Sequence, residues 1–132
     1  MNREILFKAK RIDNGEWVEG DLLHTRHADV VLISDFKDQL FRCDGNTLCQ
    51  YTGLTDKNGK KIWENDIVRD KTGDIFRIYW SEQLLNYSAK CVKSTFSVFI
   101  SQKWDLGTLL KSQIDIEVCG NVFDNADLLE VK

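Results

Sequence analysis

The chain has 132 residues, of which 42% are apolar and 30% charged, and its formal net charge is -3 at neutral pH. This balance is typical of a folded globular protein and excludes wholesale disorder. The mildly acidic charge argues against nonspecific nucleic-acid binding, because such binding depends on a basic surface that releases counterions from phosphates. No segment has a linker-like composition, so residues 1–132 are expected to form a single domain.

The first half of the chain is predicted to form antiparallel strands joined by turns. Apolar residues alternate from Ile5 to Ala9, which is the period of a half-buried strand. A turn at Asn14 and Gly15 should end this strand, and residues 16–23 should return as its hairpin partner. Further strands are expected at residues 30–33 and 40–43.

The most informative stretch of the sequence is the one from Gln50 to Val68. Within it, Asn58 and Gly59 tolerate positive φ angles, which predicts a tight type I′ turn between two strands. Asn65 is also a residue that enters the left-handed region readily, so a second reversal is expected at residues 64–66.

Two Glu-x-Asp pairs each precede two apolar residues, Glu19 with Asp21 and Glu64 with Asp66. Residues two apart on a strand share a face, so each pair could converge on a metal ion or act as an acid and a base. We favour a structural role at a turn, in which the aspartate accepts hydrogen bonds from turn amides while the apolar residues enter the core.

The second half continues the β pattern. Residues 74–80 have bulky side chains on both faces of the expected strand. This pattern indicates either a strand that is covered on both sides or one that presents aromatic rings to a partner. We favour the first, because aromatic and β-branched residues are common in strands. Residues 87–92 and 95–100 should pair, residues 104–111 permit a two-turn helix, and residues 114–119 alternate as a strand. Asn125 is expected to cap a short C-terminal helix.

The longest apolar runs, residues 30–33 and 96–100, fall far short of the roughly 20 residues that span a bilayer. The first residues carry no apolar signal core. We therefore expect a cytoplasmic protein without membrane contact, in which the cysteines are reduced. These are Cys43, Cys49, Cys91 and Cys119.

A zinc site is the second metal centre that the sequence allows. His24 and His27 could join Cys43 and Cys49, but five residues between the cysteines fit a zinc knuckle poorly. Buried thiols that act as small apolar residues are the favoured alternative, so we expect neither a metal nor another cofactor.

Several motifs along the chain together resemble the YopX family of small phage and prophage proteins. They are Arg3 to Ile5, Gln50 to Leu54, Asp56 to Gly59, Glu64 to Val68, Ile116 to Val122, and Leu128 with Leu129. The resemblance implies a mainly β fold with a small SH3-like barrel and short helical segments, encoded by a mobile element and present in a bacterial cytoplasm. It implies no activity. Family members usually have glycine at the position of Asn65 and a bulky aliphatic residue at that of Cys119.

Two functions are compatible with these features. Lys57, Lys60 and Lys61 surround the expected hairpin tip, with Tyr51 and Trp63 nearby, a combination with which small barrels bind single-stranded nucleic acid. No phosphate-binding glycine loop, nucleophile elbow or metalloprotease motif occurs. We therefore favour a non-enzymatic accessory protein that binds a protein partner or itself.

Overall fold

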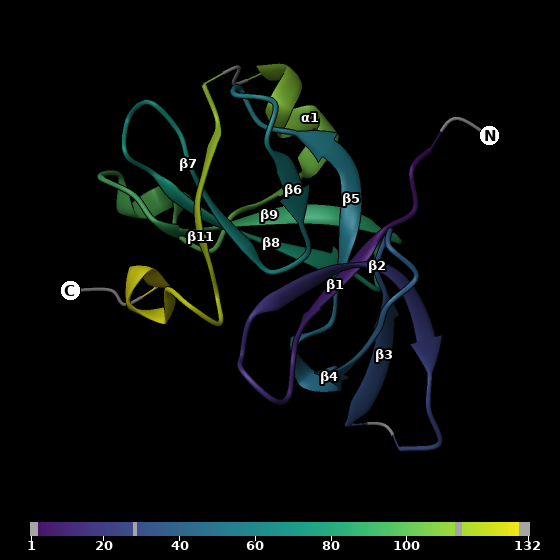
Figure 1. Ribbon diagram of the computed structural model, residues 1–132. Helices are drawn as coiled ribbons and strands as arrows, with labels where there is room; N and C mark the ends of the chain where they lie inside the picture. Colours follow the sequence, from purple (N-terminus) through teal and green to yellow (C-terminus); the bar gives the residue numbers. More distant parts are fainter. Residues whose placement is uncertain (1–2, 28, 113–114, 130–132) are drawn as a thin grey trace. The chain divides into compact units, whose positions relative to one another are not determined.

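The computed structural model describes residues 3–27, 29–112 and 115–129, which are mainly β, as predicted (Figure 1). These residues form eleven strands in two antiparallel sheets, one α-helix and three short 3-10 helices. The chain divides into two compact units, Met1–Gly53 and Leu54–Lys132, where the composition predicted one domain. The boundary falls inside strand β5 (Cys49–Thr55), which is why no linker marks it in the sequence.

Unit 1 is an antiparallel meander followed by a 3-10 turn. Its elements are β1 (Phe7–Lys10), β2 (Trp17–His24), β3 (Val30–Ser34), β4 (Leu40–Asp44) and η1 (Gly45–Thr47). Consecutive strands pair, and β1 also pairs with the start of β5. The turn at Asn14 and Gly15 is confirmed, because Gly15 has a φ of 74° and the Arg11 amide donates to the Glu16 carbonyl at 2.8 Å.

Strand β2 changes partners halfway along its length. It pairs with β1 up to Gly20 and with β3 from Asp21 onward. A Cβ atom on Gly20 would lie 1.9 Å from the Ser34 carbonyl oxygen, so only glycine fits where the two strands approach. The turn predicted at Glu19 and Asp21 is therefore wrong, because both residues are exposed in the middle of a long strand.

Unit 2 contains the second sheet, in the order β10-β9-β8-β7-β11. Its elements are β6 (Lys61–Trp63), β7 (Asp66–Arg69), β8 (Ile75–Ser81), β9 (Asn86–Lys93), η2 (Ser97–Phe99), β10 (Lys103–Asp105), α1 (Leu106–Ser112), β11 (Glu117–Asn121) and η3 (Ala126–Leu129). Helix α1 confirms the predicted helix and buries Leu106 and Leu109 against the core residues of this sheet. Asp105 precedes the helix and accepts from the Thr108 amide at 2.9 Å.

Each unit has its own apolar cluster. In unit 1 the buried members are Ala9, Val31, Ile33 and Cys43. In unit 2 the larger cluster includes Ile62, Val68, Phe76, Ile78, Leu106 and Ile116. Over the described part of the chain, none of the helices combines the length and the apolar character that crossing a membrane requires.

The expected strand at residues 95–100 is not formed. A 3-10 turn, η2, takes its place, and β9 pairs with β10 instead, with Ala89 opposite Trp104. The chain turns back after η2 at Ser101, which has a φ of 72° and donates from its amide to the Cys91 carbonyl at 2.8 Å. The apolar residues of this segment are therefore left largely exposed.

The C-terminal strand is shifted from its expected position. Ile114 lies outside the described residues, whereas β11 begins at Glu117 and continues to Asn121 through a bulge between Val118 and Gly120. The Asn125 side chain does not cap the terminal turn, because its Oδ1 accepts from the Asn121 amide at 3.1 Å. The terminal helix itself is the 3-10 turn η3.

Replacing Gly20 by alanine should destabilise unit 1 strongly. The added methyl group would meet the Ser34 backbone, which cannot move aside like a flexible side chain. We expect a loss of about 2 kcal/mol or more in unfolding free energy, measured by urea denaturation. The control is Gly107→Ala in α1, where the added methyl group would lie 3.3 Å from the Asp105 carboxylate, a side chain that can shift, so the loss should be far smaller than at Gly20. Equal effects of the two changes would refute the steric argument.

Candidate functional site

Three hairpin loops are closed in the same way by an aspartate, at Asp35, Asp56 and Asp70. In each loop one carboxylate oxygen accepts from the amides two and four residues later, at 2.9 to 3.0 Å. The residue three positions later has a positive φ in all three cases. We call these the aspartate loops, and their positive-φ residues are Asp38, Gly59 and Gly73.

The loop at Asp56 corrects the predicted turn type. Only Gly59 has a positive φ, whereas a type I′ turn requires two such residues. The Gly59 amide donates to the Asp56 carbonyl at 3.0 Å, and the Asp56 amide donates to the Lys60 carbonyl at 2.8 Å. This is a three-residue hairpin loop with a glycine bulge. The type I′ prediction is wrong because the Asp56 carboxylate, not Asn58, organises the loop.

Asp56 also ties the hairpin to the C-terminal strand of unit 2. Its second carboxylate oxygen accepts from the Val118 amide at 2.9 Å, and the Lys57 amide donates to the Ile116 carbonyl at 3.0 Å. Burial alone would raise the pKa of Asp56, but the hydrogen bonds from Val118, Lys60 and Asn58 outweigh it and hold the pKa below its ordinary value. The ionised carboxylate is thus a structural link, with no oxygen left over for chemistry.

The aromatic residues expected to stack on nucleic-acid bases are buried. Tyr51 in unit 1 is 7% exposed and Trp63 in unit 2 is 5% exposed. Rings buried to this extent offer little surface on which a base could stack. Lys57 lies 3.9 Å from Glu117, while Lys60 is exposed and Lys61 is half-buried. The predicted surface of lysines and aromatic rings is therefore not assembled.

The second Glu-x-Asp pair has the structural geometry that we expected. The Asp66 carboxylate accepts from the Trp63 amide at 2.8 Å, and Asn65 between them has a φ of 71°, which confirms the second reversal. Ile67 and Val68 follow into the core with no exposed surface. Glu64 is half-buried beside this turn.

The histidines considered as zinc ligands are exposed, whereas the cysteines considered with them are buried. The described residues contain no group of three or more histidine, cysteine, aspartate or glutamate side chains that could hold a metal ion. His24 and His27 are exposed, while Cys43 and Cys49 are buried. Burial raises the pKa of the Cys43, Cys91 and Cys119 thiols. A raised pKa disfavours the reactive thiolate at neutral pH.

Exposed apolar side chains gather at the tip of the β8–β9 hairpin. Trp80 is 41% exposed and packs edge-on against Tyr87, with ring centroids 5.0 Å apart. Leu84 and Leu85 in the loop are 68% and 73% exposed, and Leu85 has a φ of 54°. We call Trp80, Leu84 and Leu85 the hairpin-tip patch. Trp80 belongs to the segment 74–80 that was expected to carry bulk on both faces, whereas the two leucines were not predicted, because their only signal is an apolar pair in a polar loop.

A second apolar surface in unit 2 surrounds η2. Phe96 and Phe99 contact each other edge-on at 5.9 Å and line a cavity of about 420 Å³. Its polar wall includes Asp70, whose Oδ1 accepts from the loop amides of Thr72 and Asp74, and Asp115, which lies 4.0 Å from Lys71.

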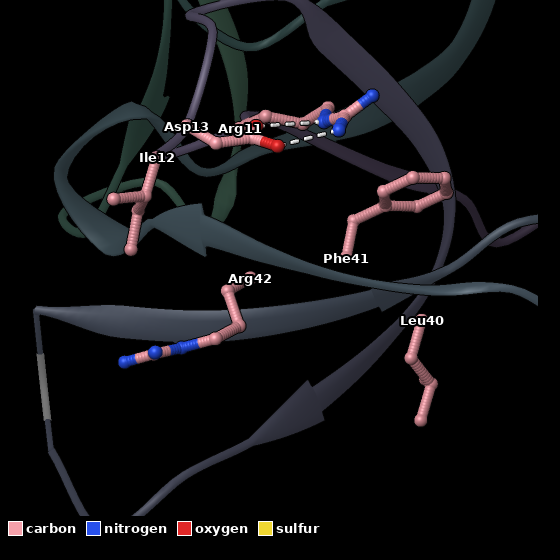
Figure 2. A pocket seen from close by; sticks show the side chains of 6 residues that line it. All are labelled: Arg11, Ile12, Asp13, Leu40, Phe41 and Arg42. Atoms are coloured by element: carbon pink, nitrogen blue, oxygen red, sulfur yellow. Dashed lines mark hydrogen bonds and ion pairs between the residues drawn. The ribbon is translucent and has the colours of Figure 1, made fainter.

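Unit 1 has an open pocket of about 430 Å³ between the end of β1 and the start of β4. It is lined by Arg11, Ile12, Asp13, Leu40, Phe41 and Arg42. Figure 2 shows the Arg11–Asp13 pair on one side with the Phe41 ring, and the side chains of Leu40 and Arg42 on the other. Arg11 binds both carboxylate oxygens of Asp13, at 2.9 and 2.6 Å, and its guanidinium lies 4.7 Å from the Phe41 ring centroid.

A family model described as YopX protein matches residues 6–130, which is nearly the whole chain. The chain belongs to the YopX family. Comparison with curated proteins gave no match. The motifs that carried the resemblance contain residues that shape the backbone, in the Asp56 loop, the Asn65 reversal and the bulged strand β11. The YopX match thus identifies a scaffold, while the exposed patch and the pocket lie outside those motifs.

Replacing Asp56 by asparagine should destabilise the protein at neutral pH by about 2 kcal/mol, because a charged acceptor of three backbone amides is lost. The pKa of Asp56 is lower in the folded state, so its contribution is present above the ordinary value of 3.8 and lost as the pH falls through the folded value. The difference in unfolding free energy between the two proteins should therefore stay constant from pH 7 down to about 3.8 and shrink as the pH falls below that value. A pH-independent difference would contradict this account.

Asp66 and Asp21 provide a matched comparison of the two Glu-x-Asp pairs. Asp66→Ala should lower the unfolding free energy by roughly 1.5 to 3 kcal/mol, because the buried Trp63 amide loses its acceptor. Asp66→Asn should do less harm, since the amide oxygen can still accept. Asp21→Ala, at an exposed strand position, should change stability by less than about 0.5 kcal/mol. Similar losses at both positions, measured by thermal unfolding, would restore the idea of a repeated device.

Proposed function

We propose that this YopX protein is a non-enzymatic accessory protein of a phage or prophage. In this proposal it acts in the cytoplasm of the bacterial host by binding a protein partner or a second copy of itself. The observation that carries the proposal is the hairpin-tip patch, in which large apolar side chains are exposed on a strained loop.

The backbone of the patch supports a role in binding rather than in folding. A leucine with positive φ costs on the order of 1 to 3 kcal/mol relative to an allowed conformation. The loop is nevertheless held in place, because the Leu84 amide donates to the Ser81 hydroxyl at 3.2 Å and Trp80 pairs with Tyr87 across the strands. Glycine or asparagine would suit the same backbone without strain. Exposed apolar residues on such a loop are typical of protein contacts.

We also propose that unit 1 is the small SH3-like barrel that the resemblance implied. Three features support this. The four strands β1 to β4 form a meander, β2 bends at Gly20 to change partners, and the end of β1 returns to β4. The return consists of a bridge between Arg11 and Cys43 and a bond of 3.0 Å from the Ile12 amide to the Arg42 carbonyl. A link between the first and the fourth strand is what closing a barrel requires.

Single-stranded nucleic-acid binding, the alternative from the sequence, has less support. That function depends on aromatic rings at the surface, and both proposed rings are buried. Without them the exposed lysines at the hairpin tip act as the solubilising charges common on such loops.

The proposal is tested by changing Leu85 to asparagine, which keeps the left-handed backbone but removes the apolar contact. Because strain is relieved, the melting temperature should stay the same or rise, while binding to the partner, or self-association, should weaken at least about tenfold. Light scattering measures self-association, and pulldown from host lysate with quantitative mass spectrometry measures partner capture.

Leu23→Ser is the matched control, because Leu23 is an exposed leucine in β2 of unit 1, outside the patch. It should leave binding unchanged. A strictly monomeric protein that retains no host protein, or one whose binding is equally weakened by both changes, would count decisively against the hairpin-tip patch.

A further inference from the structure

The outer edge of β4 is open beside the pocket of unit 1. The Asp35 amide donates to the Gln39 carbonyl at 2.9 Å, which makes these residues a hydrogen-bonded pair at the end of the β3–β4 hairpin. Hydrogen-bonded and non-hydrogen-bonded pairs alternate along antiparallel strands. In the observed register, Leu40 and Arg42 therefore belong to non-hydrogen-bonded pairs, and their backbone groups point away from β3.

The only described backbone amide that bonds to this edge confirms that the Arg42 carbonyl points away from β3. The Ile12 amide reaches the Arg42 carbonyl at 3.0 Å, and the bridge from β1 ends there, with Arg11 opposite Cys43. Beyond that point, no other described residue bonds the N–H and C=O of Leu40 or the N–H of Arg42 on this side. A strand edge with open backbone groups is a template for pairing with another extended segment.

The side chains beside this edge define what the added segment must contain. Leu40 and Arg42 are two apart in β4, so they share a face, and both are exposed. The charge of Arg11 is balanced by Asp13, whose pKa is lowered by the hydrogen bond from Arg11. Arg42 has no ion-pair partner among the described residues. The pocket thus offers an apolar wall and one uncompensated positive charge.

We propose that the edge of β4 binds an extended peptide segment of a partner protein by strand addition. The segment carries an apolar side chain and a carboxylate two positions apart. Its backbone bonds the N–H and C=O of Leu40 and the N–H of Arg42. Its apolar side chain packs on Leu40 and Ile12, and its carboxylate binds the Arg42 guanidinium. This surface consists only of unit 1 residues and is separate from the hairpin-tip patch. Its partner chemistry follows from cross-strand pairing, in which apolar and oppositely charged side chains meet on one face.

The test uses a capped hexapeptide, Thr-Val-Thr-Glu-Thr-Ala, titrated to about 1 mM into the full-length ¹⁵N-labelled protein and followed by NMR amide shifts. We expect saturable shifts at Leu40, Arg42 and Ile12. The same peptide with lysine in place of glutamate should bind at least about fivefold more weakly, because attraction to Arg42 becomes repulsion. The glutamate peptide with its backbone N-methylated should not bind, because strand addition requires its amide donors.

Arg42→Glu should reverse the preference between the two peptides, whereas Arg77→Glu, an exposed strand arginine of unit 2, should leave it unchanged. Leu85→Asn should also leave peptide binding unchanged, which separates failure of this proposal from failure of the hairpin-tip patch. No shifts at the β4 edge, or binding that survives N-methylation or Arg42→Glu, would overturn the proposal. Concentration-dependent shifts of Leu40 and Arg42 without peptide would also overturn it, because they would identify a second copy as the occupant.

Discussion

The buried or half-buried carboxylate that closes a hairpin is the interaction on which the strand order depends. In each aspartate loop one carboxylate oxygen accepts hydrogen bonds from two backbone amides of the bend. The loops at Asp35, Asp56 and Asp70 join β3 to β4, β5 to β6 and β7 to β8, so they set the register of three successive hairpins. Because the chain has no proline, side-chain acceptors and positive-φ residues build its turns.

The strand pattern could be predicted because it is local. Alternation of apolar residues located β1, a short apolar run located β3, and bulky residues on both faces located β8. Asn14 with Gly15 marked a hairpin turn, and Asn65 marked its reversal by its tolerance of positive φ. The type of the Asn58–Gly59 turn could not be predicted in the same way. Asp56 changes it by accepting two loop amides, and it also bonds Val118, which is 62 positions away in the sequence. A bond between residues so far apart leaves no periodic pattern in the sequence.

The candidate site was less predictable because exposure is a property of packing. Tyr51 and Trp63 are aromatic residues of the kind that stack on bases, yet both rings are buried. Conversely, the run from Phe96 to Ile100 reads as a buried strand, but the 3-10 turn leaves Phe96 and Val98 in solvent. Neither outcome changes the local alternation of the sequence, so only the fold could distinguish a core ring from a surface ring.

In this YopX protein the residues of the family motifs and the exposed side chains have different roles. The residues that identify the family are occupied with backbone bonds: Asp56 accepts three amides and Asp66 accepts the Trp63 amide. The Asp56 carboxylate, both of whose oxygens accept backbone amides, is poorly suited to bind a substrate as well. The side chains left with unused apolar surface or charge, such as Leu85 and Arg42, lie on hairpin loops and strand edges outside those motifs. Turns fixed by backbone bonds hold the exposed side chains of the loops and edges in a defined geometry, which is the arrangement that the proposed binding role requires.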